Sequence, residues 1–175
     1  MSKAFTRESD DSGREDRPPI RAQLPGGVRN YITAEGARRF REELERLLEA
    51  RRAGPAAGDD LEAQAGRSRL DAAIRRLQSI LDSAVISEPP PDPGKIAFGA
   101  RVRVRYSDGD EEEFQIVGVD EADPGQGRIS WISPLARALL GLKAGNTARF
   151  RSPAGEQGIE ILDVRYGVEG SNARQ

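Results

Sequence analysis

Residues 31–52 read YITAEGARRFREELERLLEARR, and this stretch decides the first half of the fold. Thr33 suits a helix N-cap, because its hydroxyl can accept a hydrogen bond from a free backbone N–H group of the first turn. Apolar side chains then recur at spacings of three, four and three residues: Ala37, Phe40, Leu44 and Leu47. This heptad spacing predicts one helix of a coiled coil.

A second run with the same spacing lies further along the chain. Its apolar residues recur at spacings of four, three, four and three: Leu70, Ile74, Leu77, Leu81 and Ala84. Packing the two runs antiparallel places Leu47 against Leu70, so the chain must reverse near residue 58 or 59. Gly54-Pro55 offers a competing turn signal, since proline has no backbone N–H and glycine tolerates tight turns. The sequence predicts an antiparallel helical hairpin.

The second half of the chain changes to a period of two residues, which is typical of β-strands. Five segments are predicted strands: RVRVRY (101–106), EEFQIVGV (112–119), GRISWI (127–132), TARFR (147–151) and IEILDVRY (159–166). Before the fourth, SPLARALLGL predicts a short helix with Ser133 as N-cap, Pro134 at the first helical position and Gly141 as C-cap. The predicted fold class is α+β, with a small antiparallel β domain and one short helix after the hairpin.

Composition places the boundaries between these parts. The proline-rich segment SEPPPDPGK indicates a stiff, extended linker. The polar residues before the hairpin and after the last strand are typical of flexible ends. The predicted organisation is a flexible extension (1–29), the coiled-coil hairpin (30–86), the linker (87–95), the β domain (96–168) and a flexible tail (169–175).

The overall composition excludes several kinds of chemistry. The 175 residues include no cysteine and no histidine, which excludes disulfides, thiol nucleophiles, histidine bases and the usual zinc sites. The net charge of -2 gives no bulk argument for nucleic-acid binding. No apolar run approaches the length of a membrane span, and the first residues have no apolar signal core. We expect a cytoplasmic protein with no membrane partner.

The segment AAGDDLEAQA at residues 56–65 carries the group of acidic side chains that could take part in chemistry. Asp59 and Glu62 are three residues apart, so they share one face if the second helix begins there. Mg²⁺ prefers oxygen ligands and often uses only one or two protein carboxylates, completing its shell with water and substrate phosphate. The tip could therefore complete a Mg²⁺ site supplied by another protein. On the residues alone, a solvated polar turn is the favoured interpretation.

Several motifs together resemble the GreA/GreB family of bacterial transcript-cleavage factors. The motifs are the helix start YITAEGARRFREELERL (31–47), a hairpin tip with the pattern GDxxE (58–62), the segment IAFGARV (96–102) and the block ISPLARALLGLKAGNTARFRSPAGEQGIEILDVRY (132–166). The start SKAFTRESDD (2–11) is most similar to GreB. The resemblance covers nearly the whole chain from about residue 25.

This resemblance implies a fold and a function. The β domain would be FKBP-like and would dock at the rim of the RNA polymerase secondary channel, through a region around Ser133, Pro134 and Ala136. The hairpin would enter the channel, where Asp59 and Glu62 help to hold a second Mg²⁺ and orient the attacking water. The polymerase itself would then cleave the backtracked RNA. The protein would be a monomeric accessory factor with no cofactor of its own.

The chain departs from the family pattern in ways that bear on cleavage. Ala63 follows Glu62, where the family has asparagine. The hairpin is also shorter than is typical of the family by roughly five residues per arm, or about 8 Å of reach. An alternative is therefore a secondary-channel binder that modulates or inhibits transcription without stimulating cleavage. A free-standing prolyl isomerase is disfavoured, because its pocket needs an aromatic lining and only 5% of the residues are aromatic.

Overall fold

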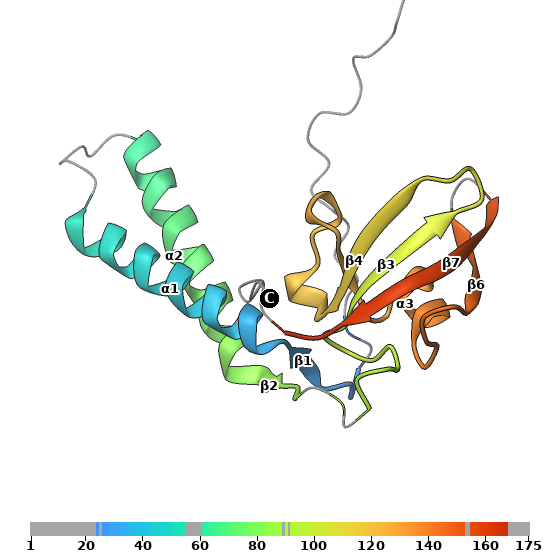
Figure 1. Ribbon diagram of the computed structural model, residues 1–175. Helices are drawn as coiled ribbons and strands as arrows, with labels where there is room; N and C mark the ends of the chain where they lie inside the picture. The colour runs from blue at the N-terminus through green and yellow to red at the C-terminus, as the bar shows by residue number, and fades with distance from the viewer. Residues whose placement is uncertain are drawn as a thin grey trace, which may run out of the picture.

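The computed structural model describes residues 24, 26–54, 61–88, 90, 92–152 and 155–167. Two long helices are followed by a mostly antiparallel β-sheet domain, so the predicted α+β class is confirmed. Figure 1 shows the helices projecting away from the sheet, with the end of the first and the start of the second farthest from it. In the described part of the chain, no helix is both long and apolar enough to cross a membrane.

The two helices are α1 (Ala34–Ala53) and α2 (Leu61–Ser83). Thr33 is the N-cap of α1, as predicted, and its hydroxyl accepts a hydrogen bond from the backbone N–H of Gly36 at 2.9 Å. Gly54 follows the last helical residue with φ of 66°, a backbone conformation that glycine adopts without a Cβ clash. The predicted reversal at residues 58–59 lies outside the described residues.

The buried seam of the hairpin follows the predicted heptads only in part. Ala37, Ile74 and Leu77 are buried as expected, and Ile80 joins them. Ala84, however, was predicted in the helical seam and instead begins strand β2. The reason is a strand pairing at this point, which takes the backbone out of the helix.

This pairing closes the base of the hairpin. Strand β1 (Asn30–Ile32) enters α1, strand β2 (Ala84–Ile86) leaves α2, and the two run parallel with Asn30 opposite Ala84. The backbone N–H of Ser87 also donates to the carbonyl of Ile32 at 3.0 Å. The chain therefore enters and leaves the hairpin at the same place.

Five strands form the sheet of the second domain, in the order β5-β4-β3-β7-β6. They are β3 (Arg101–Tyr106), β4 (Glu111–Val117), β5 (Arg128–Ser130), β6 (Thr147–Ser152) and β7 (Gly155–Arg165). Neighbours are antiparallel except β4 and β5, which run parallel and are the one exception to the predicted antiparallel sheet. Between β4 and β5 lie two 3₁₀ turns, η1 (Val119–Glu121) and η2 (Pro124–Gln126), which return the chain so that β5 can run parallel to β4.

Helix α3 (Pro134–Leu139) closes the core of this domain. Ser133 caps it and Pro134 occupies its first turn, as predicted. The C-cap is Leu140, whose backbone N–H donates to the carbonyl of Ala136, rather than the predicted Gly141, which follows with a positive φ of 83°. Ala136 and Leu139 are fully buried against apolar residues of the sheet. The other buried members of this core are Ile96, Ala100, Val102, Val104, Ile116, Ala148, Ile159 and Ile161.

Candidate functional site

Of the acidic site predicted at the tip of the hairpin, the structure describes Glu62. Glu62 lies in the first turn of α2, and its side chain is exposed. Leu61 beside it is 84% exposed, so this apolar side chain is not packed against the described part of the chain. Asp59 lies outside the described residues, so its position beside Glu62 stays a prediction.

The chemistry of Glu62 fits a shared Mg²⁺ site rather than a complete one. Its carboxylate supplies hard oxygen ligands, and the N-terminal end of a helix favours negative charge. Among the described residues, no group of three or more potential ligands comes together to hold a metal ion. A metal bound by Glu62 would therefore need most of its ligands from elsewhere.

The predicted docking residues lie at the N-terminal end of α3. Pro134 is exposed and Ser133 is half-buried, with its hydroxyl accepting from the backbone N–H of Ala136 at 3.2 Å. Ala136 is fully buried in the core, so its side chain cannot touch a partner. Only Ser133 and Pro134 of the predicted set can present a surface.

A second polar cluster, which the sequence patterns did not predict, lies at the base of the hairpin. Glu121 of η1 has a fully buried side chain that reaches the start of α1. One carboxylate oxygen accepts from the Thr33 hydroxyl at 2.5 Å. The other accepts from the backbone N–H groups of Thr33 at 2.8 Å and Gly118 at 3.0 Å. The guanidinium of Arg39 adds an ion pair at 3.7 Å, so the buried charge is well compensated.

This arrangement completes a helix cap across the domain boundary. In an ordinary capping box, a glutamate three residues after the N-cap accepts from the N-cap backbone N–H. Here that position is Gly36, and Glu121 takes the role from 88 residues away. A Cβ built on Gly36 would overlap the Glu121 carboxylate, so the glycine makes room for it. An N-cap threonine with glycine in place of glutamate was the signal available in the sequence.

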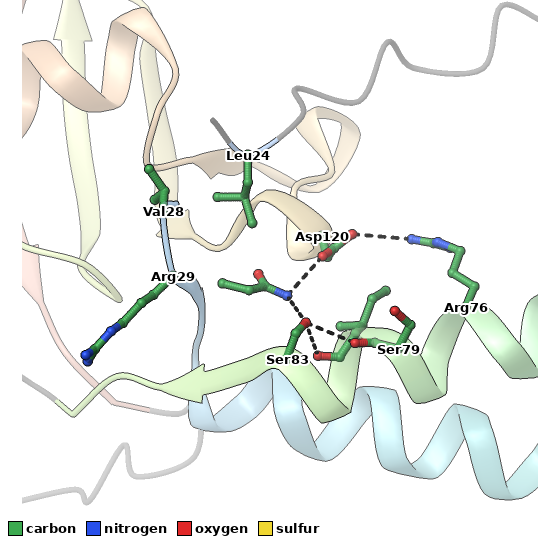
Figure 2. Close-up of a pocket in the computed structure, with 9 residues that line it drawn as sticks. Leu24, Val28, Arg29, Arg76, Ser79, Ser83 and Asp120 are labelled. Carbon is green, nitrogen blue, oxygen red and sulfur yellow. Dashed lines mark hydrogen bonds and ion pairs between the residues drawn. The ribbon is translucent and has the colours of Figure 1, made fainter. Parts of the chain in front are cut away.

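The neighbouring residue Asp120 reaches the other helix. Its carboxylate accepts from the side-chain amide of Asn30 at 3.3 Å and pairs with Arg76 of α2 at 3.9 Å. The same Asn30 amide donates to the hydroxyl of Ser83, near the end of α2, at 3.3 Å. Figure 2 shows Asp120 directed toward Arg76, in an open groove of about 550 Å³ between η1, β1 and α2.

Apolar and charged contacts support the same junction. Tyr31 lies between two aromatic rings, with centroids 6.2 Å from Phe98 and 6.4 Å from Trp131. Arg101 on β3 pairs with Glu35 in the first turn of α1 at 3.5 Å. A Cβ built on Gly118 would overlap the backbone carbonyl of Tyr31, so β1 and η1 pack as closely as the backbone allows.

Comparison with known proteins assigns the family. A family model described as "Transcription elongation factor, GreA/GreB, C-term" matches residues 90–166. The chain is 36% identical to transcription elongation factor GreB of Neisseria meningitidis over 155 residues, which are 79% of this chain and 95% of the relative. It is 37% identical to transcription elongation factor GreA of Alkalilimnicola ehrlichii over 153 residues, covering 77% of this chain and 96% of the relative. The chain therefore belongs to the GreA/GreB family of transcription elongation factors, as the motifs predicted.

Solved structures of the same type were also found. GreA factor homolog 1 of Thermus thermophilus is 24% identical, with 79% of this chain and 99% of that chain covered and a TM-score of 0.39. The GreA/GreB factor of Nitrosomonas europaea is 26% identical, with 79% and 100% covered and the same TM-score. At this TM-score the superposition is loose, and the family assignment rests on the sequence relatives.

Proposed function

We propose that this protein binds RNA polymerase at its secondary channel and stimulates the polymerase's Mg²⁺-dependent cleavage of backtracked RNA. The observation that carries the proposal is the exposed carboxylate of Glu62 at the end of a helical arm farthest from the β domain. Membership of a family of transcription elongation factors supports RNA polymerase as the partner. In this role the protein is a monomeric accessory factor that acts in the cytoplasm and has no cofactor of its own.

Each part of the chain has a distinct task in this proposal. The β domain docks on the polymerase through the exposed start of α3, at Ser133 and Pro134. The hairpin is the arm that enters the channel, and the 20 residues of α1 give it a length of about 30 Å. Asp59 and Glu62 would hold a Mg²⁺ ion through carboxylate oxygens and would orient the attacking water by accepting its hydrogen bond. The Mg²⁺ ion, when bound, supplies Lewis-acid activation of that water.

A secondary-channel binder without cleavage activity is the second candidate. Two expectations from the family resemblance favour it: the pattern has asparagine where Ala63 follows Glu62, and its hairpin is longer by roughly five residues per arm. A deficit of about 8 Å exceeds the roughly 2 Å reach of a metal–oxygen bond, so deeper docking would be required for cleavage.

RNA length in stalled, backtracked elongation complexes separates the two candidates. We expect the purified protein with Mg²⁺ to shorten the transcript. Glu62→Gln and Asp59→Asn should each lower the cleavage rate by at least about tenfold, because each removes a charged metal ligand. Glu45→Gln, which removes an equally exposed acid from the middle of α1, is the matched control and should leave the rate unchanged.

The same assay defines the contradicting outcomes. Polymerase binding without RNA shortening would reject cleavage and support the modulator. Equal loss of cleavage in the Glu45→Gln control would show that bulk charge, rather than the tip site, matters. A protein that fails to bind the polymerase at all would exclude both candidates.

A further inference from the structure

The hairpin is joined to the β domain by two adjacent acids that hold its two helices separately. Glu121 binds the start of α1 through the hydroxyl and backbone N–H of Thr33. Asp120 binds Arg76 on α2 and the Asn30 amide on β1. Both acids belong to the same 3₁₀ turn, η1, so one short segment contacts both arms of the hairpin.

We infer that Asp120 and Glu121 form a clamp that fixes the direction of the hairpin relative to the β domain. Their role in function rests on the cleavage activity proposed above. There they are positioning residues, because they set the location of Asp59 and Glu62 and do not contact metal or RNA themselves. The clamp consists of these two side chains and their partners Thr33, Asn30 and Arg76.

The burial and hydrogen bonding of Glu121 make this contact directional. Each of its oxygens accepts a hydrogen bond from Thr33 on the hairpin side, and the carboxylate also accepts from the backbone N–H of Gly118 in its own domain. Moving the helix start away would leave the buried carboxylate with the Gly118 N–H alone and would leave the Thr33 N–H without its acceptor, which is costly. The free energy of the junction therefore favours one orientation over its neighbours.

The length of the hairpin makes the position of its tip sensitive to small rotations at its base. A rotation of about 10° at the base would displace the end of an arm about 30 Å long by about 5 Å. Metal coordination tolerates far less, since Mg²⁺–oxygen distances are about 2.0–2.1 Å. A hairpin that swings by even a few degrees would still bind its partner through the β domain but would present its carboxylates in the wrong place.

An interdomain distance measurement tests the clamp without any polymerase. The chain has no cysteine, so Glu49→Cys on α1 and Arg103→Cys on β3, both exposed, give two unique positions for spin labels. We expect a narrow distance distribution in the otherwise unchanged protein. Asp120→Ala and Glu121→Gln should each broaden or shift it, whereas Glu111→Ala should not, because the Glu111 side chain pairs with Arg105 inside the β domain.

The functional readout is a split between binding and cleavage. The clamp variants should lower the maximal cleavage rate at least about tenfold while changing the half-saturating protein concentration less than about threefold. A variant that is merely less folded would change both, because the β domain that docks would be lost as well. Asp120 is half-buried, so Asp120→Ala tests the clamp even if Glu121→Gln prevents folding.

Each outcome has a distinct meaning. An unchanged distance distribution in Asp120→Ala would overturn the clamp. A broadened distribution with unchanged cleavage would overturn its role in positioning the tip. A broadened distribution in a protein that never stimulates cleavage would support the clamp and reject the proposed cleavage function, so the two failures are distinguishable.

Discussion

At its base the hairpin has Ile32 and Ala37 fully buried and a carboxylate from the other domain capping α1, whereas at its far end Leu61 is 84% exposed. The same two helices thus have buried, hydrogen-bonded contacts at one end and a solvated side chain at the other. The difference shows that tertiary contacts at the junction, rather than the coiled-coil seam alone, stabilise the arm. The exposed tip is accessible for binding, and the contacts at the base set the position of the tip relative to the β domain.

The difference between the two ends is tested by truncating one large aliphatic side chain to alanine at each end. Ile80→Ala, near the base end of α2 at a position 6% exposed, should lower the free energy of unfolding of the hairpin by about 2–5 kcal/mol, because it leaves a cavity. Leu61→Ala should change it by less than about 0.5 kcal/mol. Urea titration followed by helical circular dichroism measures both, and equal effects would show that the tip is packed as well as the base.

A smaller effect, of opposite sign at the two ends, is expected from replacing glycine by alanine. Gly36→Ala should destabilise the junction by about 1–3 kcal/mol, since the new Cβ displaces the buried Glu121 carboxylate from its partners. Gly66→Ala in the exposed part of α2 meets open space and should stabilise the protein by about 0.5–1 kcal/mol, because alanine favours the helix. Thermal unfolding of the two variants gives the signs. Stabilisation by both would mean that Glu121 moves aside without cost.

The smallest expected effect lies in the β domain, away from both ends of the hairpin. Burial and a hydrogen bond to Glu112 raise the pKa of Tyr106 to about 12. Because the folded pKa lies above the ordinary value near 10, the unfolded chain loses its proton first as pH rises. Stability should therefore fall between about pH 10 and 12, by less than about 1 kcal/mol because the side chain is partly solvated.

The control for this pH dependence is Tyr106→Phe, which cannot ionise. Its unfolding free energy should lose this part of the alkaline slope while the signal of the hairpin helices stays the same. Comparison of the two proteins by denaturant titration at pH 9 and pH 11 measures the effect. Identical slopes would show that Tyr106 does not contribute.

Local patterns predicted the elements that local interactions determine. The Thr33 cap, the start of α1 and the Ser133-Pro134 start of α3 all follow from neighbours within one helical turn, and all are confirmed. The motif resemblance identified the family, which the relatives confirm. Glu62 was selected by that resemblance, since its spacing from Asp59 alone favoured a solvated polar turn.

The junction was not predictable by the same means. Glu121 and Thr33 are separated by 88 residues, and no periodic pattern reports a contact between such distant positions. Ala84 fits the heptad spacing, but pairing of β1 with β2 overrides the helical pattern there. The parallel placement of β5 beside β4 depends on the path of η1 and η2, which a strand pattern does not specify.

The parallel pairing of β1 with β2 has a consequence for how this arm can change in length. Because the chain enters and leaves the hairpin side by side, residues can be added or removed in matched numbers on both arms without disturbing the junction. Each matched pair changes the length by about 1.5 Å, and one heptad per arm by about 10 Å. The length of the hairpin can thus change independently of its orientation relative to the β domain.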